Sequence, residues 1–317
     1  MFKLLANENM KIYPRLRTYI LVGVLALAVI LIAWIQADVQ KPNPNWKQTL
    51  TTQNTQISQE LKQTKAKLPA RTRVQLQQKE TLNDYYISHN TDPNRQTLWT
   101  FNQAIVTNVP PLLLAFILVV AGDIVASEFS AGTIKFLLTQ TKRRYIVLLA
   151  KYLATLFFGL VMTCAFFVIS TAVGALFFGA HGAGLPHFYN TPSGSVAQMS
   201  TLSYVFMQYG FLLIQIVIVS TIAFMISTIF RNSAVAITLS ILAYLLGNSI
   251  CRVLAEYGFQ WTKYILFSNM DFSQYVVGGP LVNGMTAWFS VGMVVAYFLV
   301  MNVLTWWIFM KRDVALT

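Results

Sequence analysis

Long apolar runs, broken by short polar segments, constrain the fold of this chain more than any other feature. Val109 to Ala126 is almost uncharged, and Tyr145 to Gly179 is apolar apart from Lys151. Both runs are long enough to cross a bilayer, which takes about 20 helical residues at ~1.5 Å each. The chain is 56% hydrophobic and 11% charged, whereas soluble domains have about a quarter charged residues. We therefore expect an all-α polytopic membrane protein.

The remaining apolar runs bring the predicted number of transmembrane spans to six. In order, the spans begin and end near Tyr19 to Ile35, Trp99 to Ala126, Tyr145 to Gly179, Leu202 to Phe230, Ser233 to Ile250 and Gly284 to Met310. Residues 18–36 thus hold span 1, and residues 99–317 hold spans 2–6. Pro110 and Pro111 are expected to bend the second span or to begin its regular part.

The distribution of Lys and Arg predicts the orientation, because short loops rich in these residues stay in the cytoplasm. With both termini cytoplasmic, twelve of the 23 basic residues lie at the inner face: Lys3, Lys11, Arg15, Arg17, Lys135, Lys142, Arg143, Arg144, Lys151, Arg231, Lys311 and Arg312. Outside one long polar insertion, Arg252 and Lys263 are the outer ones. The opposite orientation would reverse this asymmetry, so we expect both termini inside.

Residues 1–17 are predicted to form an amphipathic interfacial helix on the inner leaflet. They carry four basic residues against a single acid, Glu8, together with apolar residues such as Phe2, Leu5 and Ile12. A cleaved signal peptide is the competing interpretation. It is disfavoured because the following apolar run is longer than a usual signal-peptide core and no small-residue cleavage site ends it.

Residues 37–98 are predicted to form a water-exposed, helical extracytoplasmic insertion. The segment is rich in Gln, Thr, Asn and Lys and has almost no aliphatic runs. Its nine basic residues do not contradict the orientation, because segments of this length translocate largely regardless of charge. Leu50, Ile57, Leu61 and Leu68 have spacings that suit a helix pair with a narrow seam. The insertion is either a ligand-capturing or regulatory module or a solvated hairpin with no ligand of its own.

Two further segments are assigned to the outer side. Ala180 to Thr201 is interpreted as a loop, and its His181 and His187 lack the third ligand that a metal site needs. Residues 251–283 are too polar to span yet rich in aromatics, from Trp261 to Tyr275. We expect them to form re-entrant helices that dip into the outer leaflet before span 6, with their backbone covered by protein.

Several classes of chemistry are not supported by the sequence. The net charge of +12 is spread over loops between apolar spans, which disfavours nucleic-acid binding. No Gly is followed by Lys, so the chain has no nucleotide-binding P-loop, and we predict no catalytic, metal or cofactor site. Cys164 and Cys251 form no metal-binding pair. Asp123 and Glu128 are expected to pair with Lys135 or with the basic cluster that follows it, rather than to relay protons.

The stretch from Glu128 to Lys151 interrupts the apolar runs with a short amphipathic piece and a cationic cluster. It reads Glu128, then Gly132-Thr133-Ile134-Lys135, Leu137-Leu138, Arg143-Arg144 and finally Leu148-Leu149-Ala150-Lys151. This pattern resembles the cytoplasmic loop that follows the second span in the membrane-spanning permease subunits of type-2 ABC transporters. The predicted amphipathic N-terminal helix, six spans and dipping helices also resemble that family.

The resemblance implies a coupling helix at about 130–139 that docks on a separate cytoplasmic ABC ATPase. The implied docking residues are Glu128, Ala131, Gly132, Thr133, Ile134, Lys135, Leu137, Leu138, Arg143 and Arg144. It also implies a second permease subunit, identical or homologous, with ATP and Mg²⁺ on the ATPase and not on this chain. The implied localisation is the bacterial cytoplasmic membrane, and the implied activity is ATP-driven export.

The sequence departs from the family pattern at two places. Thr141 stands where many relatives have Pro. Only some subfamilies carry an outer domain at the place of the long insertion, including several that resemble bacterial peptide-antibiotic, bacteriocin-immunity and sodium exporters. A peptide antibiotic, an amphiphile or an ion is the expected cargo, with antibiotic resistance by efflux as one role. The alternatives are a membrane sensor or immunity protein that captures a ligand without transport, a secondary transporter, which the near absence of charges inside the spans disfavours, and a lipid-modifying enzyme, for which no polar cluster is found.

Overall fold

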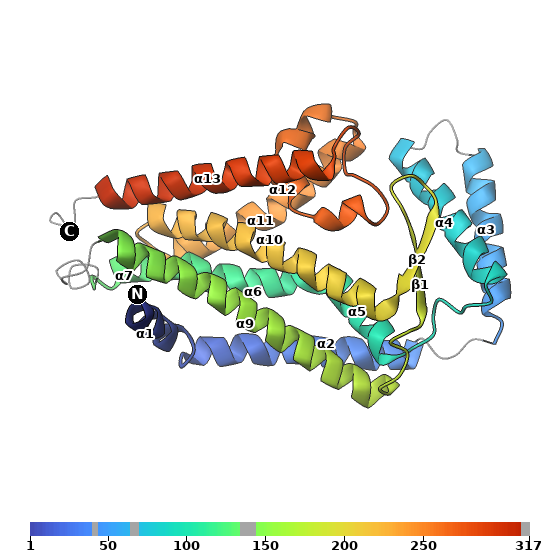
Figure 1. Ribbon diagram of the computed structural model, residues 1–317, viewed down its shortest axis with the longest axis horizontal. Helices are drawn as coiled ribbons and strands as arrows, with labels where there is room; N and C mark the ends of the chain where they lie inside the picture. The colour runs from blue at the N-terminus through green and yellow to red at the C-terminus, as the bar shows by residue number, and fades with distance from the viewer. Residues whose placement is uncertain (40–43, 64–69, 134–143, 312–317) are drawn as a thin grey trace.

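Helices dominate the structure, and the long ones run side by side along the longest axis of the molecule (Figure 1). The computed structural model describes residues 1–39, 44–63, 70–133 and 144–311. The helices are α1 (Phe2–Ile12), α2 (Leu16–Val39), α3 (Trp46–Gln63), α4 (Ala70–Ser88), α5 (Leu98–Asn108), α6 (Pro110–Asp123), α7 (Ala126–Ser130), α9 (Arg144–Phe178), α10 (Thr201–Ile229), α11 (Ser233–Glu256), α12 (Leu266–Asn269) and α13 (Ala287–Lys311). Short 3₁₀ helices, η1 (Gln260–Tyr264) and η2 (Phe272–Tyr275), flank α12.

Five of these helices, α2, α9, α10, α11 and α13, are long and apolar enough to cross a membrane. The bent pair α5 and α6 passes the same test when its two helices are taken together, which would give up to six spans. The expected helical, polytopic membrane protein therefore agrees with the structure. Both α2 and α13 bury little of their apolar length, 17% and 11%, whereas α10 buries 61%. Hence α10 is central, and α2 and α13 present mostly apolar surface outward.

The second predicted span is broken where its two prolines lie. The helix α5 ends at Asn108, α6 begins with Pro110, and the two axes differ by 54°. Proline lacks the amide hydrogen that would continue α5 but fits the first turn of a new helix. Both α5 and α6 pack against α10 and α9, and α6 also packs against α11.

At one end of the bundle, α3 and α4 pack against each other as a helical hairpin, which we call the α3–α4 end (Figure 1). Leu50 and Ile57 are buried there. The contact is partly polar, because Asn54 donates to the Asp84 carboxylate over 2.7 Å and accepts from the Asn83 amide over 2.8 Å. Leu68 of the predicted seam lies outside the described residues.

The segment interpreted as an irregular loop contains two strands, which the all-α prediction did not include. The strands β1 (Pro186–Asn190) and β2 (Val196–Ser200) pair antiparallel, with Phe188 opposite Gln198. Aromatic residues in β1 favour extended backbone, and Gly194 takes a positive φ of 84° in the connection. Strands of this length carry too weak a pattern for the sequence interpretation to have found them.

Between α11 and α13, short helices replace a continuous span, as expected for residues 251–283. The helix α11 continues six residues beyond the predicted end at Ile250, to Glu256, and η1, α12 and η2 follow. Opposite this region, α1 and α7 lie together at the other end of the molecule, which we call the α1 end (Figure 1). The helix α13 finishes at the same end.

Candidate coupling site: an ionic network at the α1 end

Glu128 of α7 lies at the centre of a network of charged side chains at the α1 end. Its side chain is largely buried, with 9% of the residue exposed. One carboxylate oxygen, Oε1, accepts hydrogen bonds from Lys11 Nζ and Lys151 Nζ, each over 2.9 Å. The other oxygen accepts from the Thr133 hydroxyl over 2.8 Å. Glu128 thus joins α1, α9 and the chain that follows α7.

The ammonium group of Lys151 is buried, since the residue is 1% exposed. Besides Glu128, it donates to Glu8 Oε2 over 2.8 Å and to the Ile124 carbonyl over 3.3 Å. An unpaired buried charge is very unfavourable, and these acceptors use all three donors of the ammonium group. Lys11 also contacts Glu8 over 3.1 Å. Two lysines and two glutamates therefore form a neutral quartet.

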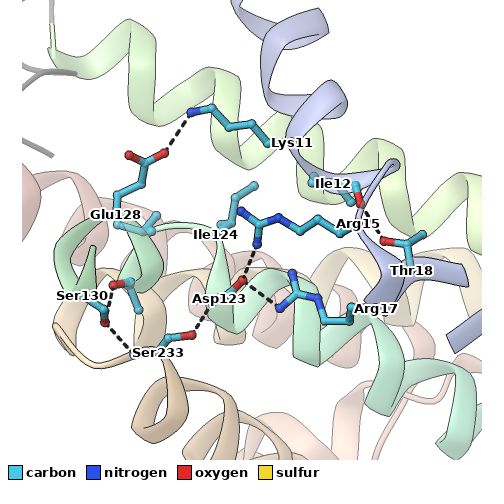
Figure 2. A network of polar contacts seen from close by, with 12 residues as sticks. Lys11, Ile12, Arg15, Arg17, Thr18, Asp123, Ile124, Glu128, Ser130 and Ser233 are labelled. Carbon is cyan, nitrogen blue, oxygen red and sulfur yellow. Dashed lines mark hydrogen bonds and ion pairs between the residues drawn. The ribbon is translucent and has the colours of Figure 1, made fainter. Parts of the chain in front are cut away.

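A second carboxylate, Asp123 at the end of α6, holds the turn between α1 and α2 (Figure 2). Its Oδ2 accepts from Arg15 over 3.0 Å and from Arg17 over 2.8 Å, while Oδ1 accepts from the Ser233 hydroxyl at the start of α11. Asp123 is 5% exposed. The N-terminal segment is consequently tied to α6 by ion pairs separate from those of Glu128.

Serine hydroxyls fasten α7 to the α10–α11 connection. Ser227 of α10 accepts from the backbone amides of Val125 and Ala126, over 3.1 and 3.0 Å, where α6 gives way to α7. Ser130 donates to the Arg231 carbonyl over 2.9 Å and accepts from the Ser233 amide over 3.2 Å (Figure 2). The short helix α7 is therefore held on several sides by parts of the chain about 100 residues away.

The charges of this network favour its ionised form. Burial alone would raise the pKa of Glu128, but Lys151, Lys11 and Thr133 outweigh it and lower that pKa from 4.5 to about 2. Burial opposes ionisation of Lys11 as well, yet Glu128 and Glu8 raise its pKa overall. The cavity among these side chains is about 20 Å³, room for about one water molecule. The arrangement is suited to holding α1, α7 and α9 together, and it leaves no space for a larger ligand.

The structure places only some of the predicted docking residues. Glu128 and Thr133 lie in the network, while Ala131 and Gly132 are exposed just beyond α7, where Gly132 has a φ of 68°. Arg144 begins α9. The remaining predicted residues, Ile134, Lys135, Leu137, Leu138 and Arg143, lie outside the described residues.

The expected ion pairing of Asp123 and Glu128 is found, but with partners that the sequence interpretation did not name. Their described partners come from the N-terminal segment and α9, whereas Lys135 and residues 142 and 143 lie outside the described part. Two signals were present in the sequence. Glu8 is the single acid of its segment, and Lys151 is the single charge in a long apolar run.

No group of three or more His, Cys, Asp or Glu side chains suited to a metal occurs in the described part of the chain. His181 and His187 belong to no such group among these residues. Cys164 and Cys251 are both free, the first exposed and the second buried. The site that these observations define is therefore an ionic junction between helices of a membrane protein.

Comparison with known proteins assigns the chain to a family. It belongs to the family described as "Protein of unknown function (DUF2705)", which matches residues 72–315. It is similar to "Uncharacterized protein YhcI" of Bacillus subtilis (strain 168), with 35% identity covering 99% of this chain and 100% of the relative. It is also similar to "Uncharacterized membrane protein YdbK" of the same organism, with 30% identity over 64% of this chain and 78% of the relative. The description of YdbK agrees with the apolar helices found here.

Proposed function

We propose that this chain is the membrane subunit of an ATP-driven exporter of the type-2 ABC kind. Two such subunits, identical or homologous, form the path, and separate ATPase subunits dock at the α1 end. In this proposal the bent pair α5–α6 is one of six spans, and α1 lies at the membrane surface. The short helices before α13 dip into the outer leaflet. A peptide antibiotic, an amphiphile or an ion is the proposed cargo.

The observation that carries this proposal is the contact between Glu128 and Lys151. These residues are the first and the last of the sequence pattern that resembles the type-2 permease loop, and their side chains meet over 2.9 Å. The chain between them leaves α7 and returns as α9. Glu128 and Lys151 contact each other, and both also contact residues of α1. A force applied to the segment between them would therefore be transmitted to α1, α7 and α9 together.

The proposed orientation follows from the same end of the molecule. Lys11, Arg15 and Arg17 gather around the network at the α1 end, and the sequence places Lys142, Arg143 and Arg144 nearby along the chain. Positively charged short loops remain in the cytoplasm. An ATPase docking there would therefore approach from the side on which ATP is present.

Co-purification tests the proposal. The tagged chain would be expressed with the ATPase encoded beside it, and the complex isolated from membranes. We expect wild-type chain to retain the ATPase. Leu137→Asp should lose it, because an unpaired charge in an apolar contact costs several kcal/mol, and ~1.4 kcal/mol is tenfold in affinity.

Lys142→Asp is the matched control, since exposed ion pairs contribute about 1 kcal/mol or less. It should retain most of the ATPase. If Leu137→Asp reaches the membrane at normal abundance and still retains the ATPase, the motor does not dock through this segment. If no ATPase is retained even by wild-type chain, a sensor or immunity protein becomes the better assignment.

A further inference from the structure

A cavity of about 630 Å³ lies at the α3–α4 end, far from the ionic network. Its walls come from the end of α2, from α5, from the connection between α4 and α5, and from β1. Trp46 of α3 and Tyr86 of α4 also line it. The volume falls within the range of about 300–1,000 Å³ that is typical of small-molecule sites.

One wall of this cavity is a polar stripe on α5, a helix that otherwise packs into the core. Phe101 and Ile105 are fully buried on one side, whereas Thr100, Gln103 and Thr107 line the cavity on the other. Among the described residues, the Gln103 side-chain amide has no hydrogen-bond partner. An amide facing lipid without a partner is costly. The stripe is therefore suited to an aqueous, ligand-accessible space.

The α3–α4 hairpin is held in place above this stripe by aromatic contacts with β1. The ring of Phe188 lies 5.0 Å from that of Tyr86 and 4.9 Å from that of Tyr85, between centroids. In addition, the Asn190 amide donates to the Gln78 carbonyl over 3.0 Å. These contacts fix the hairpin against the bundle. Tyr86, which lines the cavity, is thus held by direct contact with β1.

The lining has the chemistry of a site for a neutral, hydroxyl-rich ligand. Asp92 and Arg95 are its only charged residues within the described part of the chain, and their charges cancel. His187 adds no charge at neutral pH, because burial lowers its pKa to about 4. Six carboxamide side chains line the cavity: Gln36, Asn90, Asn94, Gln96, Gln103 and Asn108.

Carboxamides both donate and accept hydrogen bonds, so they match adjacent hydroxyl groups, which do the same. Trp46 and Tyr86 supply flat apolar faces with polar edges, suited to the C–H faces of a sugar ring. An anionic ligand would need surplus cations, and an apolar one would need apolar walls. In the described residues the lining has no surplus of cations, and its apolar groups stand among polar side chains.

We propose that this cavity binds a neutral saccharide of about two or three rings, either free or as the head group of a lipid. The proposal goes beyond ATPase coupling and does not depend on it, because binding is measured on this chain alone. Free saccharide and glycolipid present the same head to the site. The experiment separates them.

The test uses the full chain in phosphatidylcholine nanodiscs, purified without sugar detergents. Maltose is titrated as the soluble probe, and a low fraction of alkyl maltoside in the nanodisc presents the same head on a lipid-like chain. Binding is followed by the quenching or enhancement of tryptophan fluorescence and by the shift in unfolding temperature. A tripeptide, Gly-Asn-Gly, serves as a neutral probe of another class.

We expect saturable binding of one or both maltose probes, with affinity reduced about tenfold or more in Gln103→Leu. Gln36→Leu, on the wall that α2 forms, should weaken binding in the same way, which guards against a folding defect in either variant alone. Gln77→Leu is the control, because Gln77 is exposed on α4 and does not line the cavity.

Binding of free maltose would assign a soluble ligand, and binding of the maltoside alone would assign a lipid head group. The proposal is overturned if neither maltose probe binds saturably, or if only the tripeptide does. It is equally overturned if Gln103→Leu and Gln36→Leu bind as tightly as Gln77→Leu.

Discussion

Lys151 shows how a single residue can join distant parts of a membrane protein. Its ammonium group is nearly inaccessible and contacts Glu8, 143 positions earlier, as well as Glu128, 23 positions earlier. A buried ion pair is a weak source of net stability, but breaking one leaves a charge without a partner. The quartet therefore contributes more to the choice of which helices pack together than to the net stability of that packing.

Lys151→Met tests this view. It removes the buried cation, and among the described residues Lys11 is then the one cation paired with Glu8 and Glu128. We expect a loss of about 3–5 kcal/mol in the free energy of unfolding, seen as a lower unfolding temperature and lower abundance in membranes. Lys11→Met is the control, because that side chain is 36% exposed and its loss should be milder.

Adding Glu8→Gln to Lys151→Met should recover part of the loss, since it removes one of the stranded negative charges. A Lys151→Met variant no less stable than Lys11→Met would show that the buried Lys151 ammonium is not needed to hold the two glutamates.

The lowered pKa of Glu128 predicts an acid-sensitive contribution to stability. A carboxyl whose pKa is 4.5 when unfolded and about 2 when folded stabilises the fold fully above pH 4.5. That contribution declines as pH falls from 4.5 to about 2. Unfolding temperatures measured across this window should fall less steeply in Glu128→Gln than in wild type. Identical slopes in the two proteins would show that Glu128 is not held ionised by the network.

Sequence patterns predicted some of these contacts. Glu128 and Lys151 are the first and last residues of the pattern that resembles the type-2 permease loop, and ion pairing of Asp123 and Glu128 was expected. Contacts over more than 100 positions, such as Lys11 with Glu128, depend on where the helices pack, which no local pattern encodes. The predicted docking residues from 134 to 138 and Arg143 lie outside the described residues, so their role stays a prediction.

Apolar length predicted the long helices, and the spacing of Leu50 and Ile57 predicted the helix pair α3–α4, whereas no pattern indicated the two strands. A helix buried in lipid needs about 20 apolar residues, so its presence is visible in the sequence. The strands β1 and β2 have five residues each and depend on contacts with α4. The end of α11 was also missed, because Cys251 to Glu256 is too polar for a span yet continues the helix toward α12.

The junction of α11 and α12 offers a test of element packing. Gly247 lies under the ring of Phe267, and a Cβ added there would come within 2.3 Å of that ring. Gly247→Ala should displace Phe267 and destabilise the protein by about 1–3 kcal/mol, measured by thermal unfolding.

Gly210→Ala is the matched control within α10, because nothing lies within 4 Å of its added Cβ. Alanine is also the better helix former by about 1 kcal/mol. Gly210→Ala should therefore be neutral or stabilising. If Gly247→Ala behaves in the same way, α12 is not held on α11 by this contact.

The two ends of the molecule differ in chemistry. A bilayer around the middle of the bundle, which would place the two ends on opposite sides of the membrane, would explain this difference. The α1 end holds the ionic network, while the α3–α4 end holds a polar cavity with little net charge. The distribution of basic residues predicts that the α1 end faces the cytoplasm, and this orientation stays a prediction. The polar cavity was not foreseen, because its walls come from α2, α5 and β1, which are far apart along the chain.

Cysteine labelling on intact cells tests whether the membrane separates the two ends. Cys164→Ala and Cys251→Ala supply the background, and Ser193→Cys or Ala131→Cys is then added, both at exposed positions. The positive-inside rule predicts that an impermeant maleimide reaches Ser193→Cys and not Ala131→Cys. After permeabilisation both should react, which shows that Ala131→Cys is shielded by the bilayer and not by the fold.

Labelling of Ala131→Cys alone would invert the orientation and move the ATPase-docking end outside, where no ATP is available. Labelling of both before permeabilisation would mean that no bilayer lies between the ends, and the spans would have to be reassigned.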